Sequence, residues 1–210
     1  MSMEVVCFDL EGVFVPEIWI NVAQATGIEA LRLTTRDVPI YDQLMAHRLE
    51  ILDQHNLKIS DIRQVIATLQ PLPGARSFLD WARQNFQVVI LSDTFYDFAE
   101  PLMAQLGQPV LFCHNLVLDQ SGRITGWQIR LPEHKKQAVQ SLQALNFPVF
   151  AVGDSYNDTA MLLAADQGFL FNPPPNVIAE FPQLPVITSY QDLQSQLIKA
   201  SSRFLTGPTS

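Results

Sequence analysis

The sequence has little cysteine: Cys7 and Cys113 are the only two in 210 residues, and both lie in apolar, strand-like segments. Such residues are typical of buried thiols in a reducing compartment rather than of a disulfide-stapled protein. The chain also lacks an apolar run of about 18 residues, which a membrane-spanning helix requires. Its first residues lack the basic flank and the cleavage site of a signal peptide. We therefore expect a cytoplasmic protein with no membrane partner.

Positive charge is scarce as well. There are 13 Lys and Arg against 21 Asp and Glu, a formal net charge of −8, and the basic residues form no cluster. This argues against nucleic acid and anionic membranes as partners. The sequence has neither the Gly-rich loop of P-loop proteins nor a His/Cys spacing typical of zinc sites. An anionic ligand would therefore need a metal ion together with a few Lys or Arg side chains.

What the sequence does have is an alternation of apolar, strand-like runs and amphipathic helical segments. Its length and its hydrophobic fraction of 48% suit one large domain, or one domain with a small insert. We expect strands at 4–15, 87–91, 110–112, 148–152 and 168–171, helices at 75–85, 98–106, 135–145, around 161–163 and at 190–199, an edge hairpin of 116–118 with 124–129, and a frayed tail at 201–210. Strands that alternate with helices predict an α/β fold with a doubly wound parallel sheet.

Residues 16–72 interrupt this alternation. Their apolar residues recur every three to four positions, as amphipathic helices require, and no convincing strand is present. Ser60 is the predicted N-cap of the last helix in this segment. Turn-forming residues at 70–74 then close it. We therefore predict a core domain formed by residues 1–15 and 73–210, with a small helical cap, residues 16–72, inserted after the first strand.

Polar side chains follow three of the expected strands, at the point where each strand ends. They are Asp9 and Glu11 after the first strand, Ser92 and Asp93 after the second, and Asp154, Asn157 and Asp158 after a later one. Taken alone, the first pair is equally well explained as a solvated strand end before a turn. Three such ends, however, converge on one crevice at the carboxyl edge of a parallel sheet. Carboxylates gathered there need a cation, and Asp9 and Asp154 suit an octahedral Mg²⁺.

This set of groups favours phosphoryl transfer, which needs little beyond positioning and charge neutralisation. Asp9 would attack phosphorus and form an aspartyl-phosphate. Glu11, two residues further on, would protonate the leaving oxygen and later activate water. Ser92 would bind a phosphoryl oxygen, helped by backbone N–H groups of the following turn. A Lys at the start of the helix at 135–145 would neutralise the phosphate.

These elements, in this order, resemble the haloacid dehalogenase superfamily of phosphatases over roughly residues 4–190. The segment 9–13 resembles the first motif of that superfamily, Ser92 the second, Lys135 or Lys136 the third, and the segment 153–158 the fourth. The resemblance implies the doubly wound core of that superfamily, with a small helical cap after the first motif. It also implies a Mg²⁺ cofactor.

One residue departs from the superfamily's pattern, because its phosphatases usually have Asp where Glu11 stands. With this Glu, the segment 9–20 resembles one branch, the bifunctional phosphoserine phosphatases that also act as phosphoserine:homoserine phosphotransferases. The resemblance to this branch implies O-phosphoserine and homoserine as small-molecule substrates. A homodimer is an open alternative to a monomer.

The resemblance also implies roles for particular residues. Glu17 would bind the amino group of phosphoserine and Arg48 its carboxylate, while Asp93 would bind phosphate through its backbone. Lys135 is preferred over Lys136 as the third-motif residue, because the helix then turns its apolar residues inward. The implied catalytic residues are Asp9, Glu11 and Lys135; the substrate-binding residues are Glu17, Arg48, Ser92, Asp93, Lys135 and Asn157; and the Mg²⁺ ligands are Asp9, Asp154 and the backbone carbonyl of Glu11.

Two other functions stay open from the sequence. One is a phosphatase for a different small phosphate ester, such as a sugar phosphate or a nucleotide. The other is a non-catalytic protein that binds a phosphorylated metabolite, for which Glu11 is the only hint. The four His residues share no spacing or motif, and we expect none of them to be catalytic. We expect the three Trp residues to serve in packing.

Overall fold

A computed structural model describes residues 3–34, 37–38, 40 and onward to 204. Within these residues the chain forms a seven-stranded sheet in the order β4-β3-β2-β1-β5-β6-β7. All neighbouring strands are parallel except β3 and β4, which pair antiparallel at one edge. The strands are β1 (Val5–Phe8), β2 (Gln87–Phe95), β3 (Val110–Leu118), β4 (Ile124–Gln128), β5 (Val149–Gly153), β6 (Gln167–Phe171) and β7 (Val186–Ile187).

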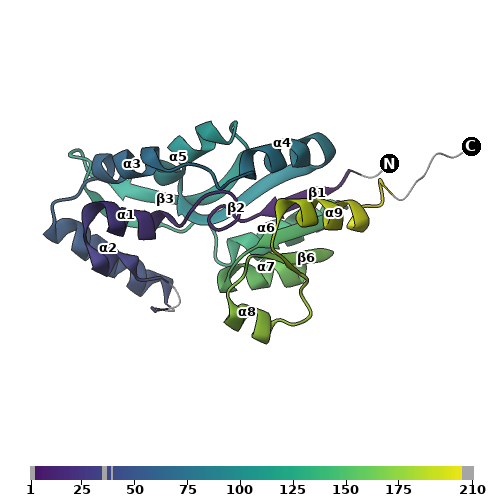
Figure 1. The fold of residues 1–210 in the computed structure, drawn as a ribbon. Helices are drawn as coiled ribbons and strands as arrows, with labels where there is room; N and C mark the ends of the chain where they lie inside the picture. The colour runs from purple at the N-terminus through teal and green to yellow at the C-terminus, as the bar shows by residue number, and fades with distance from the viewer. Residues whose placement is uncertain (1–2, 35–36, 39, 205–210) are drawn as a thin grey trace, which may run out of the picture.

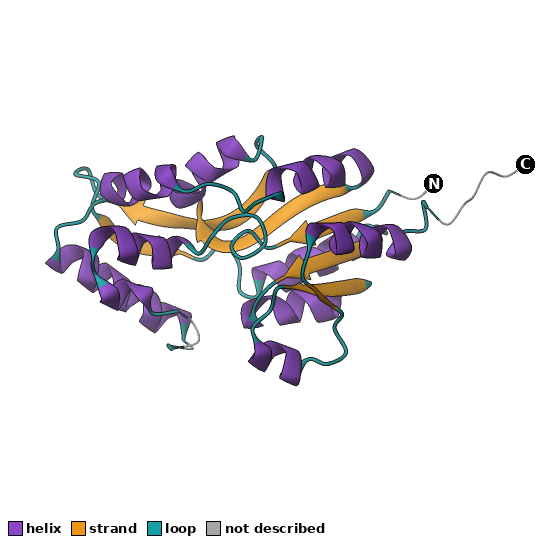
Figure 2. Cartoon of the chain, viewed as in Figure 1, coloured by secondary structure: helices purple, strands orange, loops and turns teal. Residues whose placement is uncertain are grey.

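Helices cover both faces of this sheet (Figures 1 and 2). The apolar core on one face includes side chains of α4 (Ala75–Asn85), α5 (Tyr96–Gln105) and α9 (Tyr190–Ala200). The core on the other face includes side chains of α6 (His134–Ala144), α7 (Thr159–Ala164) and α8 (Pro175–Glu180). Burying apolar residues on both faces is what a central parallel strand such as β1 requires, and all four of its residues are buried. The predicted α/β fold with a doubly wound parallel sheet is confirmed.

Several element boundaries differ from those expected. The first strand ends at Phe8 rather than at residue 15, because the chain turns back on itself after Asp9. Segments 110–112 and 116–118 belong to one continuous strand, β3. Helix α3 begins at Ile59 with Lys58 as its N-cap, so the prediction of Ser60 as N-cap was wrong. Helix α8 and strand β7 were not expected.

Residues 16–72 are helical where the structure describes them, with no strand in those described residues. They form α1 (Ile18–Thr26), a 3₁₀ helix η1 (Glu29–Arg32), α2 (Tyr41–Gln54) and α3 (Ile59–Thr68). Buried side chains from α1, α2 and α3 join the same apolar core as α4 and α5. The division into two domains stays a prediction. None of the described helices has the length and apolar character needed to cross a membrane.

Helix α2 is fastened to the hairpin formed by β3 and β4. Trp127 Nε1 donates to Asp42 at the start of α2, at 3.2 Å, so this Trp does more than pack. Arg123 forms a two-point ion pair with Asp53 near the end of α2. The next helix is attached to the turn of the hairpin, where the Ile59 N–H donates to the Gly122 carbonyl at 3.0 Å.

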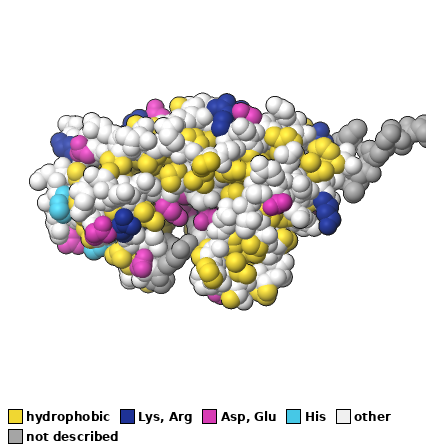
Figure 3. Space-filling view, in the orientation of Figure 1, with side chains coloured by type: hydrophobic (Ala, Val, Ile, Leu, Met, Phe, Trp, Pro, Cys, Tyr) yellow, Lys and Arg dark blue, Asp and Glu magenta, His cyan; other side chains and the backbone are white. Residues whose placement is uncertain are grey.

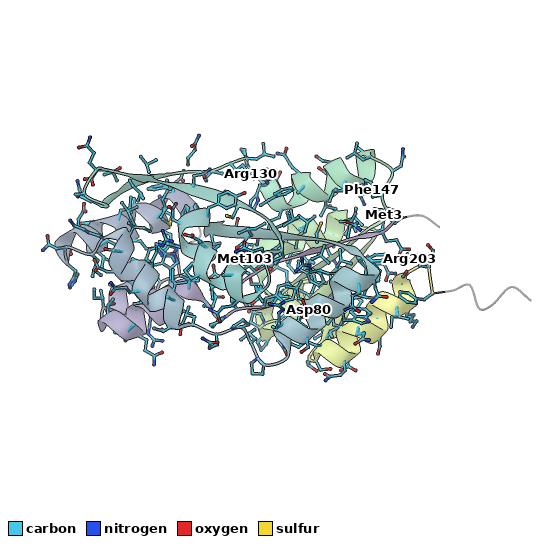
Figure 4. All side chains as sticks on the ribbon, turned by 90° about the horizontal axis from the view of Figure 1, so that it is seen from above. Met3, Asp80, Met103, Arg130, Phe147 and Arg203 are labelled. Carbon is cyan, nitrogen blue, oxygen red and sulfur yellow. The ribbon has the colours of Figure 1, made fainter. Side chains whose placement is uncertain are left out.

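The sequence predicts a frayed tail at 201–210, but the first residues of this segment are held in place. Ser201 is fully buried, and its hydroxyl donates to the carboxylate of Glu4. The Ser202 N–H and hydroxyl donate to the other oxygen of Glu4, at 2.9 and 2.8 Å. In Figure 4, Met3 and Arg203 accordingly lie at the same end of the molecule. The rest of the predicted tail, residues 205–210, lies outside the described residues.

Candidate active site

A tight loop after β1 brings two acids into one cavity. The Asp9 N–H still bonds to β5, but the Leu10 carbonyl then accepts from the N–H groups of Phe14 and Val15, which reverses the chain. The Glu11 carboxylate is fixed by the Ile18 N–H, which donates to its Oε2 at 2.8 Å. Both acids therefore face the same cavity of about 300 Å³. On the side of the molecule seen in Figure 3, acidic side chains gather around a central hollow.

The cavity collects nearly all of the residues that were expected to form the site. They come from the carboxyl ends of β1, β2 and β5, from the start of α6, and from α1 and α2. The residues that line it and were predicted are Asp9, Glu11, Glu17, Arg48, Ser92, Asp93, Lys135, Asp154 and Asn157. Lys136 is not among them, because it points to the surface and pairs with Glu133.

Lys135 is buried among three carboxylates. Its Nζ lies 2.8 Å from Asp158, 2.9 Å from Asp9 and 3.2 Å from Asp93. Burial alone would lower the pKa of Lys135, but these carboxylates raise it well above its usual value. The ammonium therefore stays charged, and its three N–H groups are held in fixed directions.

Asp9, Asp154 and Asp158 form a buried acidic cluster whose carboxylate oxygens lie within 4.8 Å of one another. One ammonium cannot balance all of them. Burial, and then the charge of Asp158, raise the pKa of Asp9 well above its usual value and that of Asp154 to about 7. Asp158 is already engaged, because it bonds to Lys135 and to the N–H groups of Asp154 and Ser155.

The donor set fits a divalent cation. Asp9 and Asp154 are buried carboxylates with like charges beside them, and hard oxygen ligands of this kind suit Mg²⁺. Gly12, at a φ of +74°, lies against Asp154, and a Cβ there would stand 2.3 Å from Asp154 Oδ2. Only Gly can therefore occupy this position without moving Asp154. The expected contribution of the Glu11 backbone carbonyl stays a prediction.

Glu11 is a buried acid close to a second acid, Glu17. Burial first, and then the charge of Glu17, raise the pKa of Glu11 to about 8, although the Ile18 N–H opposes the shift. Glu17 immediately precedes α1 and lines the same cavity. Glu11, in the loop after β1, and Glu17, just before α1, thus face the same cavity.

Arg48 is a buried cation, only 6% exposed, on the cavity wall. Its guanidinium carbon lies 4.5 Å from the centre of the Trp19 ring, and its Nη2 donates to the Leu33 carbonyl at 2.8 Å. Its Nε has no hydrogen-bond partner among the described residues. A buried donor without a partner is costly, and a guanidinium in this position is suited to bind an acceptor such as a carboxylate.

Ser92 and Asp93 lie within β2, which runs on to Phe95, and do not follow it as expected. Ser92 is buried, and its hydroxyl accepts from the Thr94 N–H at 3.2 Å. The side chain of Asp93 also contacts other residues of the site, whereas a contribution from its backbone alone was expected. It accepts from Asn157 Nδ2 at 2.6 Å and pairs with Lys135, while its backbone carbonyl accepts from the Tyr41 hydroxyl at 3.0 Å. Tyr41 thereby joins α2 to the site.

Three contributors were missed: Tyr41, His114 and His134. Both His residues are buried and face Asp93. They come from β3 and α6, twenty positions apart, so no local spacing in the sequence connects them. The expectation that none of the four His residues is catalytic stays a prediction, although these two contact Asp93. Trp19 was expected only to pack, but it also forms the surface beneath Arg48.

A family model for haloacid dehalogenase-like hydrolases matches residues 3–166 of the chain. Over 204 residues the sequence is 58% identical to phosphoserine phosphatase ThrH of Pseudomonas aeruginosa, covering 97% of this chain and 100% of that protein. It is 55% identical to a phosphoserine phosphatase of Pseudomonas syringae pv. tomato, covering 97% of this chain and 86% of that protein.

Solved structures share the fold at low sequence identity. A phospho-aspartyl intermediate analogue of phosphoserine phosphatase matches with a TM-score of 0.77 at 18% identity, covering 93% of this chain and 99% of the other. A phosphoserine phosphatase in its apo form matches with a TM-score of 0.74 at 19% identity, covering 93% and 98%. At such identities the likeness concerns the arrangement of the elements alone.

Proposed function

Because the chain belongs to the haloacid dehalogenase-like hydrolase family, we propose that it is a Mg²⁺-dependent phosphoserine phosphatase that also transfers the phosphoryl group to homoserine. The observation that carries this proposal is the content of one cavity. The Asp9 carboxylate shares it with the Lys135 ammonium, with a second acid at Glu11, and with Arg48, whose Nε has no hydrogen-bond partner among the described residues. The two relatives named as phosphoserine phosphatases, at 58% and 55% identity, support the substrate.

Asp9 and Asp154 would hold the Mg²⁺, with the Glu11 backbone carbonyl as a further ligand. When bound there, the ion would offset the charge of these carboxylates and of the phosphate. Asp158 would not be a ligand, because Lys135 and two backbone N–H groups already occupy its oxygens.

In the first half of the reaction, a carboxylate oxygen of Asp9 attacks the phosphorus of O-phosphoserine. A bond forms from Asp9 to phosphorus, and the bond from phosphorus to the serine oxygen breaks. Glu11 delivers a proton to that oxygen, so serine leaves as a neutral alcohol. Lys135 offsets charge beside Asp9, and the Ser92 hydroxyl donates to a phosphoryl oxygen.

In the second half, Glu11 takes a proton from the attacking alcohol or water. The oxygen of water, or of the homoserine hydroxyl, bonds to phosphorus and the bond to Asp9 breaks. Asp9 is restored as a carboxylate, and the product is inorganic phosphate or O-phosphohomoserine. The two acceptors differ only in what occupies the place that serine has left.

Substrate selection falls to the helical segment. Arg48 would bind the substrate carboxylate through its Nε, since its planar guanidinium suits a carboxylate. Glu17 would bind the amino group. Residues 16–72 would act as a cap that excludes bulk water from the aspartyl-phosphate, which favours an alcohol acceptor over hydrolysis. A soluble substrate of this kind is consistent with the cytoplasmic location that we expect.

The test follows the phosphorus NMR spectrum of the purified protein with O-phosphoserine, Mg²⁺ and homoserine together. We expect signals of both inorganic phosphate and O-phosphohomoserine. Inorganic phosphate alone would remove the transfer reaction and leave the phosphatase. An unchanged phosphoserine signal would overturn the substrate, and a panel of sugar phosphates and nucleotides would then be tested.

A further inference from the structure

The Asp93 carboxylate joins two groups of side chains. Its Oδ2 accepts from Asn157 and lies 3.2 Å from Lys135 Nζ, inside the catalytic cavity. Its Oδ1 faces two imidazoles: His134 Nε2 lies 3.0 Å away and His114 Nε2 lies 3.7 Å away. One carboxylate thus connects the catalytic Lys to a buried pair of histidines.

The hydrogen bonds settle which ring nitrogens carry protons. Although burial opposes it, Lys135 and the two imidazoles hold the pKa of Asp93 well below its usual value, so the carboxylate only accepts. His134 must therefore carry its proton on Nε2. The Arg130 N–H donates to His114 Nδ1 at 3.3 Å, which leaves the proton of a neutral His114 on Nε2 as well. Both rings turn an N–H toward the same oxygen of Asp93.

Both rings are buried, His114 at 2% and His134 at 3% exposure, and their centroids lie 4.5 Å apart. The Nδ1 of His134 has no partner among the described residues, so the bond to Asp93 is the polar contact that the structure gives this ring. An apolar residue could fill the same space without leaving a buried nitrogen unsatisfied. The contact with Asp93 is therefore a better reason for an imidazole here than packing is.

We propose that His134, backed by His114, is a positioning residue for phosphoryl transfer, an inference that rests on the proposed function. It holds the Asp93 carboxylate so that Oδ2 directs the Lys135 ammonium and the Asn157 amide toward the phosphate site. The Lys135 ammonium donates hydrogen bonds to Asp9 and Asp158, and it forms an ion pair with Asp93 at 3.2 Å. Because His134 directly precedes Lys135 in α6, the same bond also anchors the start of that helix on β2.

The test compares His134→Phe, which keeps a ring and loses the donor, with His134→Gln, whose amide reaches toward the position of Nε2. Turnover is measured with Mg²⁺ on O-phosphoserine and on p-nitrophenyl phosphate. We expect His134→Phe to lower kcat about tenfold on both substrates with KM within about twofold. His134→Gln should regain most of that loss. The matched control is His55→Phe, at an exposed position on the far end of α2, which should keep wild-type kcat.

A double-mutant cycle with Asp93→Asn separates positioning from general damage. If His134 acts through Asp93, adding His134→Phe to Asp93→Asn should cost less than about twofold more. Additive losses, or a wild-type kcat in His134→Phe, would overturn the inference. Should His134→Phe not fold, His134→Asn, whose amide is too short to reach Asp93, takes its place in the cycle.

A spectrum of the wild-type protein keeps this inference separate from the proposed function. Two-bond ¹H–¹⁵N correlations should show that the Nε2 of His134 carries a proton, and a His134 ring protonated on Nδ1 alone overturns the inference whatever the substrate. If p-nitrophenyl phosphate is turned over but O-phosphoserine is not, the proposed substrate fails and the kcat comparison still tests His134. If neither is turned over, the proposed function fails, while the spectrum still decides on His134.

Discussion

The two ends of β1 each carry a buried carboxylate, and the protein treats them in opposite ways. Glu4, just before the strand, is 1% exposed, and its carboxylate accepts hydrogen bonds from Ser201 and Ser202. Asp9, just after the strand, is 4% exposed and faces Lys135, but also further carboxylates that raise its pKa. One acid is satisfied by dipoles, whereas the other is held among like charges.

The difference separates groups that stabilise the fold from groups that perform chemistry. A buried carboxylate with enough donors contributes to stability, and its loss exposes those donors to an apolar surrounding. A buried carboxylate among other acids costs stability until a cation or substrate arrives. We therefore distinguish a stabilising edge of the sheet, at Glu4, from the edge at Asp9 that we propose is reactive, and substitutions at the two should have opposite consequences.

Asp9→Asn should give the largest effect on kcat, and it is the most direct test of the difference between Asp9 and Glu4. Removal of the attacking carboxylate should lower kcat on the order of 10⁴-fold or more. Because one of the like charges is gone, the melting temperature in EDTA should be equal to or above that of the wild type. Calorimetry in EDTA checks this, and a clearly lower melting temperature would show that Asp9 stabilises the fold as Glu4 does.

Removal of Mg²⁺ should come next. EDTA should abolish turnover, and Mg²⁺ at about 100 times its Kd should stabilise the protein by about 2.7 kcal/mol. Asp154→Asn should lose both the activity and this stabilisation, since one of the two expected carboxylate ligands is gone. Melting curves with and without Mg²⁺ measure the effect. An equal gain in Asp154→Asn would mean that the ion binds elsewhere.

Arg48→Met extends the comparison to a buried cation without a carboxylate partner among the described residues. Its KM for O-phosphoserine should rise on the order of 10- to 100-fold, because a charge-assisted contact is lost. Its KM for p-nitrophenyl phosphate, which has no amino-acid carboxylate, should change by less than about twofold. Steady-state kinetics on both esters check this, with Arg32→Met, on the exposed η1, as the control. Equal losses on the two esters would count against carboxylate binding.

Glu4→Leu should give the smallest effect on catalysis and a clear effect on folding. Three donors from Ser201 and Ser202 lose their acceptor, so the free energy of unfolding should fall by about 2–3 kcal/mol. The kcat should stay at the wild-type value. Urea unfolding measures the first quantity, and Ser202→Ala, which removes one hydroxyl, should cost about 1 kcal/mol. A fall in kcat of the folded Glu4→Leu variant would mean that Glu4 affects catalysis as well as stability, which would contradict the distinction between the two edges.

The residues at the edge that we propose is reactive could be predicted from the sequence, because each stands out against its immediate neighbours. Asp9, Asp93 and Asp154 each interrupt or follow an apolar run, where an acid has no packing explanation. The stabilising edge could not be predicted, since Glu4 and Ser201 lie 197 positions apart and neither residue stands out among its neighbours. The pair of His114 and His134 was missed for the same reason, because the residue that they both face, Asp93, lies on a third element, β2.

Boundaries failed where hydrogen bonds outside the local pattern decide them. Nothing in the apolar run 4–15 indicates that the Leu10 carbonyl takes two N–H groups and ends the strand at Phe8. Ser60 is a favoured N-cap residue by type, yet the Ile59 N–H bonds to the hairpin turn at Gly122, and the helix begins two residues earlier than this N-cap predicts. Periodicity therefore predicts which elements exist better than where they end.

The attachment of α2 to the β3–β4 hairpin has a consequence for building chimeras. A design that exchanges only residues 16–72 between relatives would transplant Asp42 and Asp53 without Trp127 and Arg123, their partners on the hairpin. Residues 16–72, to which we have assigned substrate selection as a proposal, would thus form one transferable module with the β3–β4 hairpin, and α4, β2 and α5 separate the two parts in sequence. Recombination that respects this module should move substrate preference from one relative to another intact.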